Sequence, residues 1–334
     1  MKRVLVTGAT GFLGGALTRR LAMDDGLHVV ATGRRKDRGM RLAAAFENID
    51  FQRVDLGEGG RIEGLCKGIS HVFHCGALSS PWGSRSLFEV ANVVGTRNVI
   101  EGCRRYGVER LLYVSSPCVY QRGGNDGALS EDATQDGRPL NHYVATKRAA
   151  ERLIRSSGLD VISIRPRALF GPGDETLFPR VLRASRRGRF PLIGRHDPLM
   201  DCTFVENVVD ALLLAAKAPT SYSGSFYNIT NGNPMLRSEL FTRLFAEVGI
   251  PYSPREIPLA LAKVIARGAE LYSHGFTAGR VEPVLTRYTV DVMSREQILD
   301  ISAAHEELGY VPRVTIGEGL AKFGKWWRAK EAGK

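Results

Sequence analysis

Near its start the chain reads Val4-Leu5-Val6-Thr7-Gly8-Ala9-Thr10-Gly11-Phe12-Leu13-Gly14, and this stretch decides the fold class. The β-branched run over residues 4–7 predicts a strand, and the apolar spacing over residues 12–23 predicts a helix. The glycines between them let the backbone turn sharply and let a pyrophosphate approach the helix N-terminus, where free N–H groups favour negative charge. A glycine turn in this context predicts dinucleotide binding.

The first half of the chain continues this alternation. Further strands are predicted at residues 28–32, 71–75, 110–115 and 161–165, and further helices at 87–106 and 143–156. Such alternation predicts the α/β class, with a doubly wound parallel sheet that binds ligands at the carboxyl ends of its strands. We expect a dinucleotide-binding Rossmann domain over residues 1–165, to which segments near 200–232 return.

The second half is less regular and is expected to form a smaller, mainly substrate-binding lobe over residues 166–334. Its predicted helices lie at residues 178–187, 205–217, 237–248 and 259–272. The last of these has few charges. It is interpreted either as a helix packed on the core of the lobe or as the wall of a lipid pocket that could rest on a membrane surface.

The bulk composition narrows the function classes. The 334 residues carry a net charge of +11 and five scattered cysteines. No Cys-x-x-Cys pair and no metal-ligand spacing of histidines occurs, so we expect reduced thiols and no metal. No signal peptide and no membrane-spanning run is recognisable, which favours a cytoplasmic protein. The charge would suit an anionic ligand, an acyl carrier or anionic lipid, or reflects only an arginine-rich genome; no nucleic-acid motif is present.

The end of the second predicted strand bears on the choice between NAD and NADP. An acidic residue there would hydrogen-bond the adenosine ribose. The chain has Thr32-Gly33-Arg34-Arg35 instead, and a guanidinium can pair bidentately with a 2′-phosphate. We therefore expect NADP(H) in preference to NAD(H). The alternative is that Arg34 and Arg35 are solvated loop charges.

A tyrosine and a lysine four residues apart indicate proton-transfer chemistry. Tyr143 and Lys147 share one helix face. A phenol has an ordinary pKa of about 10, and a nearby ammonium lowers it, so the tyrosine could act as general acid or base at a carbonyl or alcohol. The preceding strand ends in Ser115 and Ser116, either of which could donate to the substrate oxygen. Tyr-x-x-x-Lys alone is common on helix surfaces.

Together the G-x-x-G-x-x-G spacing, the strand end at Ser115-Ser116 and the Tyr143–Lys147 pair resemble the extended short-chain dehydrogenase/reductases of the NAD-dependent epimerase/dehydratase superfamily. The resemblance implies that Ser116 is the catalytic hydroxyl, with Ser115 nearer the cofactor, and that Lys147 also holds the nicotinamide ribose. Asn92 would belong to the catalytic residues by orienting the site; its alternative is a buried amide that stabilises a helix. The implied cofactor contacts are Gly8, Thr10, Gly11, Phe12, Leu13 and Gly14 at the pyrophosphate, Asp55 and Leu56 at the adenine, Cys75, Gly76 and Ala77 at the ribose, and Pro166 and Ala168 in the loop beside the nicotinamide.

Within this superfamily the chain is most similar to the 3β-hydroxysteroid dehydrogenase-like group, and there to bacterial 2-alkyl-3-oxoalkanoate reductases. The similarity rests on Pro81-Trp82-Gly83-Ser84 and on residues 165–174, 177–180 and 227–232. It implies reversible hydride transfer between NADP and a β-oxo or β-hydroxy group of a large apolar substrate, such as a 2-alkyl-3-oxo acid or a sterol. Pro81 and Trp82 would contact that substrate, and Arg167 its carboxylate. The chain departs from the group in having Ser116 where a threonine is usual.

Two other functions stay open. A nucleotide-sugar epimerase or dehydratase uses the same scaffold, but dehydratases place Asp-Glu after the catalytic hydroxyl where this chain has Pro117-Cys118, and epimerases usually have an asparagine where it has Arg167-Ala168. A non-catalytic NADP sensor is disfavoured because Ser116, Tyr143 and Lys147 are all present. The resemblance also implies a homodimer through the helices predicted at 87–106 and 143–156.

Overall fold

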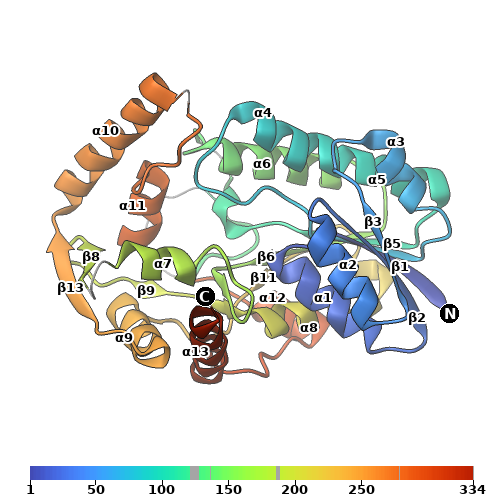
Figure 1. Cartoon of the computed structure of the whole chain (residues 1–334). Coiled ribbons are helices and arrows are strands. Elements are labelled where there is room, and N and C mark those ends of the chain that lie inside the picture. Colours follow the sequence, from blue (N-terminus) through green and yellow to red (C-terminus); the bar gives the residue numbers. More distant parts are fainter. Residues whose placement is uncertain (121–127, 136, 186–188, 278, 334) are drawn as a thin grey trace.

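The computed structural model describes residues 1–120, 128–135, 137–185, 189–277 and 279–333 (Figure 1). Its centre is a seven-stranded sheet in the order β11-β6-β5-β4-β1-β2-β3, in which every neighbouring pair is parallel. The strands are β1 Lys2–Thr7, β2 Leu27–Gly33, β3 Ile49–Arg53, β4 His71–His74, β5 Arg110–Val114, β6 Val161–Pro166 and β11 Phe226–Ile229. The predicted α/β, doubly wound parallel sheet is confirmed.

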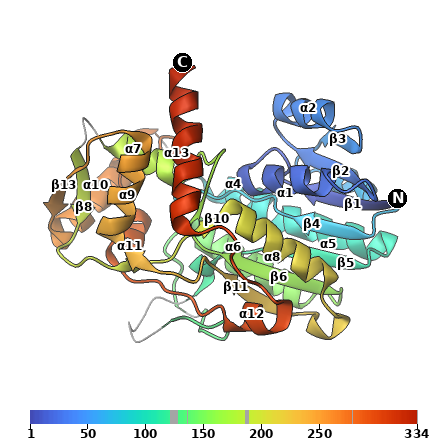
Figure 2. The ribbon, with the colours of Figure 1, turned by 90° about the horizontal axis from the view of Figure 1, so that it is seen from below.

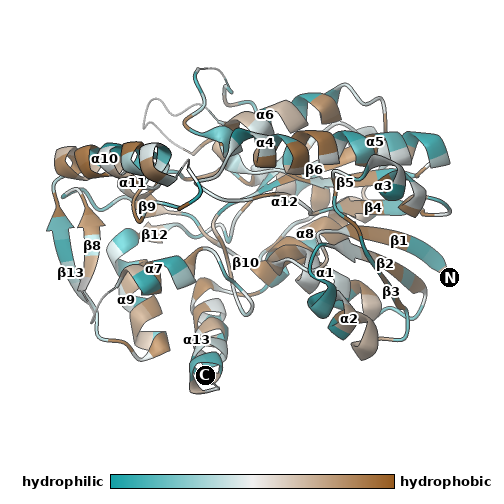
Figure 3. Ribbon diagram, turned by 45° about the horizontal axis from the view of Figure 1, so that its top comes forward, coloured by the Kyte–Doolittle hydropathy of each residue, from teal (hydrophilic) through white to brown (hydrophobic). Residues whose placement is uncertain are grey.

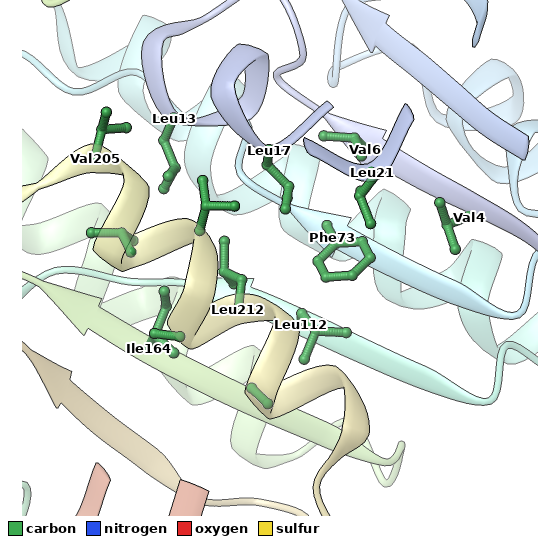
Figure 4. Close-up of a cluster of buried hydrophobic side chains, with 14 of the residues drawn as sticks. Val4, Val6, Leu13, Leu17, Leu21, Phe73, Leu112, Ile164, Val205 and Leu212 are labelled. Atoms are coloured by element: carbon green, nitrogen blue, oxygen red, sulfur yellow. The ribbon is translucent and has the colours of Figure 1, made fainter. Parts of the chain in front are cut away.

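Helices cover both faces of this sheet (Figure 1). One face carries α1 (Phe12–Ala22), α8 (Val205–Lys217) and α12 (Ser302–Leu308), and the other carries α3 (Gly59–Leu65), α5 (Gly95–Tyr106) and α6 (His142–Arg155). The edge helix α2 (Lys36–Ala45) packs on β3. Leu17 of α1 and Leu212 of α8 are fully buried with Phe73 of β4 (Figure 4). This packing fixes α1, and with it the glycine turn, against the sheet.

The helix predicted at 87–106 is not one regular α-helix. It consists of α4 (Arg85–Phe88), a π-helical segment η1 (Glu89–Val94) and α5. Such wide turns inside helices are frequent at functional sites. Here η1 contains Asn92, whose buried side chain is turned toward the loop after β4.

The second lobe gathers at the end of the molecule away from β1–β3, with α13 standing between the two parts (Figure 2). Its core is aromatic and includes Phe178, Phe241 and Phe323. Helix α7 ends at Ala184, short of the predicted 187, and residues 186–188 lie outside the described part; α10 runs five residues beyond the predicted 272, to Thr277. Its elements are α7 Phe178–Ala184, α9 Arg237–Val248, α10 Leu259–Thr277, α11 Arg287–Ser294, α13 Ile316–Ala332, and the paired strands β7 Leu169–Phe170 with β10 Thr203–Phe204, β8 Arg189–Ile193 with β13 Ser253–Ile257, and β9 Leu199–Met200 with β12 Met235–Leu236.

Short 3-10 turns occur at η2 (Pro117–Val119) and η3 (Thr220–Tyr222). Among the described residues no helix combines the length and the apolarity that crossing a bilayer would require.

Candidate active site

The glycine turn lies where the strand order reverses, between β1 and β4. Gly8 has φ +71°, and a side chain there would place its Cβ 2.7 Å from the Gly76 Cα. A Cβ on Gly14 would come within 2.2 Å of the Gly8 carbonyl oxygen. Both positions therefore require glycine, and the backbones of the two strand ends form a narrow cradle at the switch point of the sheet, where doubly wound folds bind their ligands.

The residues of this cradle fit the pyrophosphate of a dinucleotide. Gly11 is the N-cap of α1 and offers no side chain to occupy the first N–H groups of the helix. Phe12 and Leu13 open the helix at that point, and the Thr10 side chain is buried against Gly33 of β2. Free amides, the positive end of the helix dipole and the absence of side-chain atoms together favour a bound phosphate.

At the end of β2, the two arginines predicted to bind a 2′-phosphate have different surroundings. Arg34 lines a polar pocket of about 330 Å³ with Arg53, Asp55, Glu58 and Arg61. Arg34 Nε lies 3.9 Å from the Asp55 carboxylate. Leu56 lies beside it, against Gly76 and Gly95. The sequence does not single out Arg53 or Arg61, because both fall in an ordinary strand and helix pattern.

Arg35 is engaged elsewhere. It donates to Glu175 in the loop after β7 at 2.8 Å, and Arg38 donates to the other oxygen of the same carboxylate. Burial would raise the pKa of Glu175, but the two guanidinium groups lower it to about 2. This ion pair joins the second lobe to the start of α2, and a 2′-phosphate would have to compete with Glu175 for Arg35.

The turn after β4 is held by a buried polar chain. The Gly76 N–H donates to Thr7 Oγ1 at 3.1 Å, and Thr7 Oγ1 lies 2.7 Å from His74 Nδ1. His74 Nε2 in turn lies 3.0 Å from Thr96 Oγ1. Burial lowers the pKa of His74 to about 3, so this imidazole is neutral. These hydrogen bonds fix the turn Cys75-Gly76-Ala77. Within this turn, burial raises the pKa of the Cys75 thiol to about 12.

The Tyr143 phenol lies with two serine hydroxyls. Burial raises its pKa well above the usual value, and hydrogen bonds from Ser116 and Ser79 counteract that rise. The sequence predicts the opposite, a pKa lowered by Lys147, and this prediction is wrong. Ser79, an exposed residue in the loop after β4, is missed by the sequence because nothing distinguishes it from its neighbour Ser80.

The Lys147 ammonium forms its hydrogen bonds with strand β5 of the sheet. Its Nζ donates to the Val114 carbonyl at 2.8 Å and to the Tyr113 hydroxyl at 3.4 Å. Burial is the main cause of the raised pKa of Tyr143, and Lys147 is not among the groups that shift it. Burial lowers the pKa of Lys147 to about 8, so its ammonium titrates just above neutral pH.

The Asn92 side chain holds two segments of the site together by hydrogen bonds. Its Oδ1 accepts from the Leu78 N–H at 2.7 Å, and its Nδ2 donates to the Leu78 carbonyl and to Thr146 Oγ1, both at 3.1 Å. It therefore ties the loop that carries Ser79 to the helix that carries Tyr143 and Lys147. The predicted role of orienting the site and the alternative of a buried structural amide describe the same contacts.

Ser115 belongs to a buried network beneath the site. Its hydroxyl donates to Glu151 at 2.5 Å, and Arg165 donates to both oxygens of that carboxylate, at 2.9 and 2.8 Å. Burial would raise the pKa of Glu151, but Arg165 outweighs it and keeps the carboxylate charged. The network also takes in Tyr120 and Gln135. Ser115 is thus a structural partner of Glu151, and Ser116 is the hydroxyl that faces Tyr143.

The segment after β6 is strained. Ala168 has φ +42°, an unusual conformation for a residue with a side chain. Pro166, at the end of β6, pairs with Ile229 of β11. Arg167 is buried, and its guanidinium stabilises the carboxylate of Asp201, whose pKa burial raises. The predicted contact of Arg167 with a substrate carboxylate would have to compete with Asp201.

The loop with Pro81 and Trp82 meets the second lobe. Trp82 Nε1 donates to the Gly279 carbonyl at 2.9 Å, and its ring lies 4.7 Å from that of His274 on α10. The Pro81 carbonyl accepts from Asn141 Nδ2 just before α6. Pro81 and Trp82, two of the predicted substrate residues, therefore lie between the tyrosine helix and α10.

This geometry agrees with comparisons with known proteins. The model of the "NAD dependent epimerase/dehydratase family" matches residues 4–230. The chain belongs to this family. It is 34% identical to a 2-alkyl-3-oxoalkanoate reductase of Stenotrophomonas maltophilia over 96% of this chain and 98% of the relative. It is 33% identical to 3β-hydroxysteroid-dehydrogenase/decarboxylase isoform 1 of Arabidopsis thaliana, over 95% of this chain and 78% of the relative.

Among solved structures, UDP-glucuronic acid 4-epimerase from Bacillus cereus in complex with NAD superposes with a TM-score of 0.77, covering 98% of this chain and 99% of the other at 20% identity. That likeness shows the shared fold. The predicted membership among extended short-chain dehydrogenase/reductases is confirmed, and the chain is an NAD(P)-dependent enzyme acting on CH–OH groups.

Proposed function

We propose that this family member is an NADP-dependent reductase of a β-oxo group on a large apolar substrate, with Tyr143 as the general acid. The observation that carries the proposal is the meeting of the Tyr143 phenol with the Ser116 and Ser79 hydroxyls beside the glycine cradle. The names of the relatives, which include an oxoalkanoate reductase and a sterol dehydrogenase, support the substrate class.

The protonation state of the phenol suits reduction. Burial raises the pKa of Tyr143, so the hydroxyl is protonated near neutrality and is ready to donate to a carbonyl oxygen. Ser116 and Ser79 are placed to donate to the same oxygen as negative charge develops on it. A dinucleotide whose pyrophosphate is held in the cradle would supply the hydride from its nicotinamide. Lys147 would hold the cofactor ribose and keep positive charge near the reacting oxygen.

NADP rather than NAD is proposed because of the pocket at the end of β2. Arg34, Arg53 and Arg61 line it, and guanidinium groups suit a 2′-phosphate. The double variant Arg34→Ala/Arg53→Ala should raise the KM for NADPH and leave that for NADH nearly unchanged. Arg41→Ala, which removes an exposed arginine of nearby α2, is the matched control. Equal losses with both cofactors would contradict the assignment.

The direct test follows NADPH and NADH oxidation by the purified protein with a long-chain 2-alkyl-3-oxo acid. We expect NADPH to be consumed, and Tyr143→Phe to lower kcat by about 10²–10⁴-fold while cofactor binding persists. Tyr222→Phe, away from the site, should keep full activity. If neither cofactor is oxidised, the proposed substrate class is wrong, and UDP-sugars are tested next because a structural neighbour is an epimerase.

A homodimer through α5 and α6 also remains a proposal. Leu87 and Val90, beside these helices, are 60% and 44% exposed, which a partner helix pair could cover. Light scattering should give twice the chain mass, and Leu87→Glu/Val90→Glu should give the monomer.

A further inference from the structure

Half of the exposed large apolar side chains in the described part of the chain gather on one segment of the second lobe. On α10 they lie three, four or seven residues apart and so share one face of the helix. Figure 3 shows the largely hydrophobic colouring of α10. Val264, Leu271 and Phe276 are 68%, 65% and 79% exposed. The others on this face are Leu261, Ile265 and Tyr272, and we call these six residues the α10 face.

The α10 face points away from the protein. The opposite side of the helix carries the buried Ala262, Ala266 and Ser273, which seat it on the lobe. Two further exposed apolar residues, Val281 and Val284, follow the helix and form with it a groove of about 550 Å³. An apolar surface of this extent on an enzyme indicates a binding surface rather than incidental exposure.

The charges around the α10 face indicate what covers it. Within the described residues, Lys263, Arg267 and Arg280 are exposed and make no ion pair. The acidic groups nearby are neutralised: Glu270 is buried and pairs with Arg287, and Glu282 pairs with Arg180. Basic and apolar side chains without free carboxylates suit an anionic lipid surface. In a symmetric contact with a second copy, these three cations would lie close to the same three cations of the other copy, and their charges would repel.

Two aromatic residues at the end of the helix fit the same partner. The rings of Tyr272 and Phe276 stack with centroids 4.7 Å apart. Aromatic side chains favour the boundary between headgroups and acyl chains, where one end of a tyrosine can stay hydrated.

We propose that the α10 face and the adjoining groove dock this protein on an anionic lipid bilayer. Docking there would place acyl chains next to the wall that Trp82 and His274 make between α10 and the candidate active site. Tyr288 on α11, just after the groove, packs against the buried cluster that contains Tyr143. The inference goes beyond the proposed function and does not depend on which substrate is reduced.

The test is sedimentation of the full chain with vesicles of phosphatidylcholine, with and without phosphatidylglycerol, in the absence of substrate. We expect binding that needs phosphatidylglycerol and weakens at high salt. Val264→Glu and Leu271→Glu should each weaken vesicle binding by about tenfold, because a charge replaces an apolar group that docking would bury in the bilayer. Val311→Glu, at an exposed valine elsewhere, should bind as the wild type does. Lys263→Gln/Arg267→Gln should reduce the dependence on phosphatidylglycerol.

Three outcomes would overturn the proposal. The wild type could stay in the supernatant with both lipid mixtures. The α10 variants, checked for native circular dichroism, could sediment as the wild type does. Light scattering could instead show that Val264→Glu breaks a dimer while no vesicle binding occurs, which would assign the face to a second copy. Activity is measured separately, so failure of the proposed reductase function is distinguishable from failure of docking.

Discussion

Around Gly8 and Gly14 the backbone is packed so closely that no side-chain atom fits, whereas along α10 whole apolar side chains stand in solvent. The cofactor half places every polar group of the Ser115–Glu151–Arg165 network against a partner. The α10 segment leaves three cations unpaired among the described residues. The difference is that the polar groups around the cradle are satisfied within the chain, while the apolar and basic side chains of the α10 face are not, which is why docking is proposed for α10 alone.

The largest effect is expected from breaking the buried ion pair. Glu151→Ala leaves the Arg165 guanidinium, which is fully buried, without its carboxylate. The free energy of unfolding should fall by about 3–5 kcal/mol in urea titration. Glu101→Ala, which removes an exposed partner of Arg104, should change it by less than about 0.5 kcal/mol. Similar losses in the two variants would show that burial does not distinguish these pairs.

A smaller effect is expected from adding one methyl group to the cradle. Gly14→Ala would bring a Cβ against the Gly8 carbonyl and displace the turn. The Kd for NADPH, measured by fluorescence titration, should rise about tenfold to a hundredfold. Gly64→Ala on α3 has no atom within 4 Å of the new Cβ and should leave the Kd unchanged. An unchanged Kd for Gly14→Ala would mean that the cradle is not the cofactor site.

The pH dependence of reduction reports on Lys147. Its folded pKa of about 8 lies below the ordinary lysine value, so the ammonium is lost as the pH rises through about 8. The rate of reduction should be level below that pH and fall about tenfold per unit above it. Lys147→Arg keeps the charge, so whatever activity it retains should not show this fall. Identical profiles would assign the descending limb to another group.

The smallest effect is expected on the α10 face. Leu271→Ala removes a side chain that is 65% exposed and should change the unfolding free energy by less than about 0.5 kcal/mol. Leu212→Ala on α8, where leucine is fully buried, should cost about 2–5 kcal/mol. A loss of more than about 1 kcal/mol for Leu271→Ala would show that the face packs within the chain rather than against a partner.

Local patterns predict much of this molecule. The glycine turn, five of the seven strands of the sheet and the bounds of the helices at 205–217 and 237–248 follow from spacing within a few residues. Strand β3 and helices α2 and α3 in the first half are not among the predicted elements. Local spacing does not predict the continuation of α10 to Thr277 or the π-helical segment around Asn92. Packing and side-chain contacts to distant loops determine both.

The sequence by itself determined the glycine turn and the Tyr143–Lys147 pair, because residues close in the chain adopt a fixed geometry on a turn or a helix. The order of the strands, and the approach of Gly76 to Gly8 that completes the cradle, depend on contacts between distant segments. Only the tertiary structure decided that Ser79 joins Tyr143, that Glu175 takes Arg35, and that Lys147 points to Val114 instead of acidifying the tyrosine. Those contacts join segments that are distant in the chain. Their partners, and the burial that shifts their pKa values, exist only once the chain has folded.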